Sequence, residues 1–150
     1  MAVITVADVL KHAEEFEHML AEYYENLAEH ATKESVRLLA EYIGRHRVRM
    51  DAALEKLAPE QMHRIRNTPL RYEPHAADCR CFQGMELPPN ATGAQVVDVA
   101  VTFDECLVRL FRQVVRQPVD REVSDFFESL IQSEQSDEIQ LKKIKAADYF

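Results

Sequence analysis

The chain has few of the residues that interrupt helices. Three glycines and six prolines occur in 150 residues, of which 47% are hydrophobic and 29% are charged. Glycine and proline disfavour helix interiors most strongly, so their scarcity favours long helices and gives strands little support. The sequence therefore predicts an all-α protein. Its length is that of one domain, residues 1–150, which can bury a core without disulfides or a structural metal.

Clustered basic residues and long apolar runs are also missing. The formal net charge is −8, whereas affinity for nucleic acid comes largely from lysine and arginine against phosphates. We therefore expect no nucleic acid partner. No apolar run approaches the roughly 20 residues of a membrane span, and the first residues lack the basic region of a signal peptide. We expect no membrane association and a cytoplasmic location.

Cysteine is scarce as well, with Cys79 and Cys81 one residue apart and Cys106 distant in the sequence. Three cysteines in this arrangement do not predict the disulfide framework of a secreted protein. Together with His63 and His75, the first two cysteines form a candidate zinc site. Its Cys-x-Cys spacing is not that of the common zinc knuckles, which makes it the weaker metal-site hypothesis.

Apolar residues recur at helical spacing in four segments of the chain. The helices are predicted over residues 6–30, 34–57, 94–116 and 121–147. Thr5 with Asp8, and Thr92 with Gln95, have the spacing of capping boxes at two of the helix starts. Periodicity is absent over the crossover, residues 58–93, which contains five of the six prolines. Two hairpins joined by one long connection predict an antiparallel four-helix bundle of the ferritin-like type.

Potential metal ligands interrupt the apolar stripes of all four predicted helices. They are Glu17, His46, Asp104, Glu134 and Asp137. If each hairpin folds about its turn, these side chains lie at one level near the middle of the bundle. Several buried carboxylates need a cation, a shared proton or hydrogen bonds, and a metal such as iron, manganese or zinc suits this donor set. The alternative is that some of the five lean toward the surface and the acids share protons.

The first predicted helix carries an acid seven residues before an aromatic residue that is followed by Leu-Ala. These residues are Glu17, Tyr24, Leu27 and Ala28. In this signature the chain resembles the rubrerythrin and ferritin-like family, over residues 8–57 and 94–146. The resemblance implies a di-metal site built from one glutamate on each of two helices and a Glu-x-x-His pair on each of the other two.

Residue by residue, the resemblance implies that four positions serve as metal ligands: Glu17, His46, Asp104 and Glu134. Ile43 stands where the first pair has its glutamate, and Asp137 stands where the second pair has its histidine. A bridging carboxylate offsets the repulsion between two cations, which Ile43 cannot do. We therefore expect one ion, or a loosely paired second one, and weak or no rapid di-iron oxidation.

Two functions are compatible with this sequence, and whether the protein is an enzyme stays open. The first is a ferritin-like metal-binding protein, with an iron- or oxygen-linked oxidoreductase activity at a non-standard site within the bundle. The second is a non-catalytic bundle that has lost metal chemistry and acts as a binding or structural dimer. A homodimer is expected because Phe126 and Ile131 add apolar surface beside Phe127 and Leu130. Alternatively, the crossover covers this surface.

Overall fold

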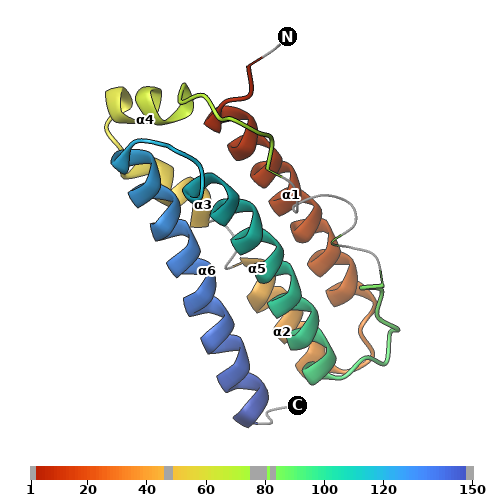
Figure 1. Ribbon diagram of the computed structural model, residues 1–150. Helices are drawn as coiled ribbons and strands as arrows, with labels where there is room; N and C mark the ends of the chain where they lie inside the picture. Colours follow the sequence, from red (N-terminus) through yellow and green to blue (C-terminus); the bar gives the residue numbers. More distant parts are fainter. Residues whose placement is uncertain (1–2, 46–48, 75–80, 82–83, 148–150) are drawn as a thin grey trace.

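The structure is a computed structural model that describes residues 3–45, 49–74, 81 and 84–147. Within these ranges it is helical and contains no strand, only one isolated bridge between Thr5 and Pro69, so the all-α prediction is confirmed (Figure 1). The helices are α1 Val6–His30, α2 Glu34–Arg45, α3 Arg49–Glu55, α4 Pro59–Arg66, α5 Gly93–Val115 and α6 Arg121–Ala147. The segment expected as one helix over 34–57 contains α2 and α3, and residues 46–48 between them lie outside the described ranges.

Side-chain caps fix the starts of α1 and α5. The Thr5 backbone N–H donates to Asp8 Oδ2 at 2.8 Å. At α5 the bonds are reciprocal, because Thr92 N–H donates to Gln95 Oε1 at 2.9 Å and Gln95 N–H donates to Thr92 Oγ1 at 3.2 Å. Such caps satisfy backbone donors that have no partner inside the helix, and each contributes about 1 kcal/mol. Both helices therefore begin where the sequence signals them.

Helix α4 corrects the expectation of an irregular crossover over residues 58–93. Pro59 occupies its first turn, where the fixed φ of proline suits a helix and its missing N–H costs nothing. The helix has eight residues and buries only Ile65, so its sequence shows no repeating apolar stripe. Arg64 Nη2 lies 2.9 Å from Glu122 Oε1, which joins α4 to the first turn of α6.

The long helices pack in two pairs, α1 with α2 and α5 with α6, and α2 also contacts α5 (Figure 1). Aromatic rings fill the core at two levels. Phe103 of α5 meets Phe16, Tyr23 and Tyr24 of α1 at centroid distances of 6.2, 5.1 and 6.3 Å. Elsewhere the ring of Phe127 contacts other phenylalanine rings of α5 and α6. The first cluster holds α1 against α5, and the second holds α5 against α6.

The apolar surface on which the homodimer prediction was based is buried inside the chain. Phe126 is 7% exposed and Ile131 is 4% exposed. Helix α3 contacts α6, and Ala53 and Leu57 line a groove together with Phe126. The segment after α2 therefore covers part of the surface that we expected to be free. The homodimer stays a prediction, but these two side chains no longer support it.

Hydrogen bonds attach the first part of the crossover to the ends of α1 and α5. Leu70 N–H donates to the Ile4 carbonyl at 2.8 Å. Gln117, which follows α5 and is buried, accepts from Arg71 N–H at 2.8 Å and donates to the Tyr72 carbonyl at 3.0 Å. One side chain thus satisfies two backbone groups of the crossover, which fixes its path at this end.

The last part of the crossover is attached to α1. Tyr23 Oη donates to the Met85 carbonyl at 2.5 Å, and Thr32 N–H, just beyond α1, donates to the Pro89 carbonyl at 2.9 Å. The crossover is therefore held at both of its ends.

None of the helices in the described ranges is both long enough and apolar enough to cross a bilayer.

The partly buried Tyr23 hydroxyl predicts a loss of stability at high pH. Burial raises the pKa of Tyr23 to about 12 from 10.0, so the unfolded chain loses this proton before the folded chain does. The contribution is complete below pH 10 and is lost as the pH rises from 10 through 12. Urea titrations at pH 9 and pH 11.5 should show a smaller decrease in unfolding free energy for Tyr23→Phe than for the native chain. Equal decreases would contradict the assignment, and Tyr72→Phe, at an exposed tyrosine, is the control.

Candidate metal centre

Two of the expected ligands are buried in the core of the two most closely packed helices. Asp104 of α5 is 0% exposed and Glu134 of α6 is 3% exposed, and among the residues whose side chains the structure describes they are the only buried carboxyl groups. Taking an ionised carboxylate out of water costs on the order of several kcal/mol unless other groups compensate. Both side chains have interaction partners, so burial alone does not identify the compensating group. It does show that this level of the core is built to hold polar groups.

The half-buried Glu17 lies at the same level of the fold as Asp104. Phe16, the residue before Glu17, packs edge-on against Phe103, the residue before Asp104, with ring centroids 6.2 Å apart. This contact fixes the relative height of α1 and α5. The contact joins the residues that precede the two acids, and the convergence of the acids themselves stays a prediction.

Acidic groups from α5 and α6 interact at this level. Burial raises the pKa of Glu138 above its ordinary value, and the negative charge of Glu105 raises it further, while Lys142 opposes the shift. Glu134 and Asp137 contribute smaller shifts in the upward direction. Asp137 itself is half-buried. Carboxyl groups of both helices thus lie near enough to repel one another when ionised.

The apolar stripes do not indicate Glu105 and Glu138, which also belong to this acidic group. Both signals were present: Glu105 directly follows Asp104, and Glu138 lies one helical turn after Glu134. Neither residue lies on the apolar stripe, so a simple division into inward and outward faces assigns both to solvent. Glu138 is in fact only partly exposed.

The five-residue centre cannot be assembled from the described residues alone. His46 lies outside them, and within them no three His, Cys, Asp or Glu side chains are grouped so that they could hold a metal ion. Ile43, which stands where the family has a bridging glutamate, is buried in the core and supplies no ligand. Convergence of Glu17, Asp104, Glu134 and Asp137 with His46 therefore stays a prediction.

The cysteines depart from expectation, because Cys81 and Cys106 form a disulfide between the crossover and α5. Their Cα atoms are 6.5 Å apart and they are separated by 25 residues in the sequence. The oxidised Cys81 is not available as a thiolate for the zinc site proposed with His63. The rest of that candidate, His75 and Cys79, lies outside the described residues. Disulfides are rare in reducing compartments such as the cytoplasm, so this bond does not favour the predicted cytoplasmic location. That location stays a prediction.

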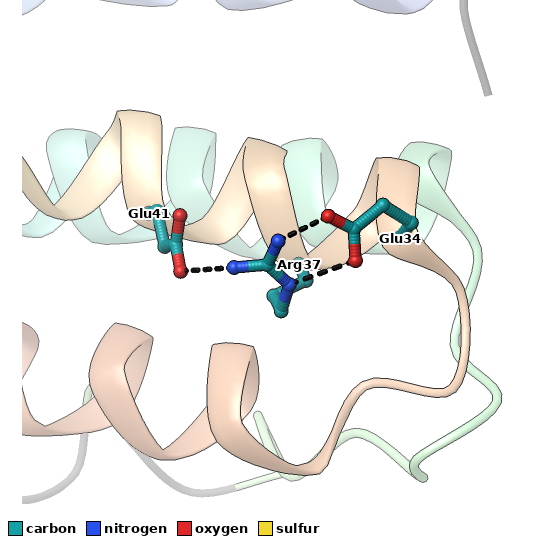
Figure 2. Close-up of polar contacts among 3 residues, drawn as sticks. All are labelled: Glu34, Arg37 and Glu41. Carbon is teal, nitrogen blue, oxygen red and sulfur yellow. Dashed lines mark hydrogen bonds and ion pairs between the residues drawn. The ribbon is translucent and has the colours of Figure 1, made fainter.

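A separate groove of about 640 Å³ lies between α1 and α2. Small residues such as Ala28, Ala40 and Gly44 form part of its wall, and Arg37 lies at its rim. Figure 2 shows Arg37 between two acids: its Nε donates to Glu34 Oε2 at 2.9 Å and its Nη1 donates to Glu41 Oε1 at 2.6 Å. The Arg37 hydrogen bond lowers the pKa of Glu34. The guanidinium is engaged on both sides, so it does not make this groove an anion site.

No family model, curated protein or solved structure matches the chain. The resemblance to the rubrerythrin and ferritin-like family therefore depends on the residues already named and on their spacing.

Proposed function

We propose that the chain is a ferritin-like antiparallel four-helix bundle, with one long crossover, that binds a divalent cation between its helices. The observation that carries the proposal is the burial of Asp104 and Glu134 on the packed pair α5 and α6. The charges of Glu105 and Glu138 make the same region more negative. A cation bound there would offset both the desolvation and the repulsion of these carboxylates.

The donor set fits a metal that accepts oxygen ligands and one imidazole. Asp104 and Glu134 would hold it, with Glu17 and Asp137 reaching in from partly exposed positions and His46 as the nitrogen donor. Iron, manganese and zinc all accept this combination. A bound metal would supply Lewis acidity and, for iron or manganese, one-electron chemistry, which would make the chain an iron- or oxygen-linked oxidoreductase.

The side chains around the site favour one ion over two. Ile43 is buried where a bridging carboxylate would be needed, so nothing at that position offsets the repulsion between neighbouring cations. The carboxylates themselves attract the ion and fix its position. The same buried isoleucine favours the alternative function, a structural or binding bundle in which these acids hold protons in place of a metal.

Metal binding by untagged protein separates these alternatives. Glu134→Gln keeps the shape of the side chain and removes its charge, so we expect at least about tenfold weaker binding of Mn²⁺, Zn²⁺ or anaerobic Fe²⁺ in calorimetric titrations. Glu128→Gln makes the same change at an exposed position on α6 and should bind as the native chain does. Equal affinities for both variants would reject the site.

Two further variants examine the composition of the ligand set in the same titrations. His46→Ala should weaken binding, since imidazole is the single nitrogen donor proposed. Ile43→Glu should raise iron occupancy by restoring a bridging carboxylate. Two tightly bound irons per native chain, with fast oxygen consumption, would contradict the single-ion proposal. A native chain that binds no metal, together with a more stable Glu134→Gln variant, would favour the structural alternative.

A further inference from the structure

Two large apolar side chains are exposed on the outer face of α2. Leu38 is 50% exposed and Tyr42 is 41% exposed, whereas Val36, Leu39 and Ile43 of the same helix are buried. Leu38 and Tyr42 are four residues apart, so they lie one turn apart on one side of the helix. Single exposed apolar residues are common on protein surfaces, but adjacent ones favour contact with another molecule.

Opposite charges flank this apolar pair along the same face of α2. Arg45 is exposed one turn beyond the pair, and Glu34 is exposed one turn before it. Arg37 bonds to both Glu34 and Glu41, so one positive charge meets two carboxylates and this end of α2 keeps an excess negative charge (Figure 2). The Glu34 side chain is still 68% exposed, so its carboxylate can accept a hydrogen bond from a further donor.

The order acid, leucine, tyrosine, base is self-complementary. Consider two α2 helices that run antiparallel about a two-fold axis at the level of residue 40. Leu38 then lies opposite Tyr42 of the second copy, and Glu34 comes within about one residue, or about 1.5 Å along the axis, of Arg45 of the second copy. The two-fold axis repeats each contact. The charges at the two ends of this face therefore fit a second copy of the same chain.

We propose that the outer face of α2 is the interface of a homodimer, in which α2 packs antiparallel against α2 of a second copy. This face is opposite the buried residues of α2, so dimer formation leaves the core and the candidate metal centre unchanged. A contact between two helices of 12 residues is shorter than most stable interfaces, so the dimer should dissociate on dilution. The ion pairs select the partner and fix the register.

Sedimentation velocity from low to high micromolar concentration, with a chelator present, tests the apolar part of the interface. The mass of the native chain should rise from monomer to dimer. Leu38→Gln should raise the dissociation constant at least about tenfold, because the symmetric contact loses an apolar side chain in both copies. Ile139→Gln makes a comparable change at an exposed residue of α6 and should dimerise as the native chain does.

Charge reversal tests the register. Glu34→Lys and Arg45→Glu each place like charges together at both ends of the interface, so each should raise the dissociation constant at least about tenfold. A mixture of these two variants should form a heterodimer with a dissociation constant within about threefold of the native value, because each ion pair again joins opposite charges. Glu128→Lys reverses an exposed acid of α6 and should dimerise as the native chain does. Circular dichroism establishes that every variant is folded.

Three results would overturn the proposal. One is a native chain that stays monomeric at every concentration, which would leave this face to another occupant such as a helix of a different protein. Another is the same dissociation constant for Leu38→Gln and Ile139→Gln. The third is a mixture of the two charge-reversed variants that does not associate. Because a chelator is present throughout, none of these results bears on metal binding, and the two proposals fail separately.

Discussion

Replacing Phe103 by alanine should lower the free energy of unfolding by about 4 kcal/mol. The ring is fully buried and meets Phe16, Tyr23 and Tyr24 of α1, so truncation removes apolar contacts and leaves a cavity between α1 and α5. Urea denaturation checks this as a lower midpoint with an unchanged slope.

Two variants establish that the effect comes from this packing. Phe103→Leu retains much of the volume and should cost about 1.5 kcal/mol. Ile139→Ala truncates an apolar side chain of α6 that is 55% exposed, and it should change stability by less than about 0.5 kcal/mol. A loss below about 1 kcal/mol for Phe103→Ala would show that α1 and α5 are not joined by this ring cluster.

The second large effect is expected from the disulfide. Cys81→Ser should lower the unfolding free energy by about 3 kcal/mol, because a crosslink between residues 25 apart in sequence restricts the unfolded chain. Urea denaturation under non-oxidising and non-reducing conditions measures the difference.

Reduction provides the control for the disulfide prediction. Cys79→Ser removes a cysteine outside the bond and should unfold as the native chain does. A reducing agent should bring native chain and Cys81→Ser to the same midpoint. Equal stability of Cys81→Ser and Cys79→Ser in oxidised samples would show that the bond does not stabilise the fold.

Local signals in the sequence predicted the long helices well, because each signal acts over a few residues. The reciprocal bonds of Thr92 and Gln95 mark the start of α5, and the apolar repeat marks its length. Helix α4 was missed because a helix with Ile65 as its one buried residue has no repeat to detect. Its proline at the first turn was the available signal.

Features that depend on how separate segments meet could not be predicted in the same way. No local pattern indicates that Cys81 passes next to Cys106, since the path of the crossover is set by contacts such as those of Gln117. Phe126 and Ile131 were assigned to an intermolecular surface on the assumption that α6 buries a single narrow face. Helix α6 instead contacts both α5 and α3, so a wide apolar arc is satisfied within one chain.

Of the candidate site, the sequence predicted the burial of two acids, and the site itself stays a prediction. Asp104 and Glu134 lie on apolar stripes, so their burial follows from the helical repeat. The involvement of Glu138 arises from its neighbours on α5 as well as on its own helix, and a stripe drawn on one helix does not contain that information. The involvement of Glu138 becomes visible only when the positions of α5 and α6 relative to each other are known.

The order in which the partners of the Phe103 cluster occur along the chain has a consequence for synthesis. Helices α5 and α6 form the most extensive helix pair in the described ranges and are joined by a short connection, so they can associate quickly once both are made. Helix α1, however, leaves the ribosome long before α5. Synthesis adds about 5–20 residues per second, so several seconds pass between the synthesis of Phe16 and Tyr24 and that of Phe103. During this interval the nascent chain exposes an aromatic surface to which chaperones and other unfinished chains can bind.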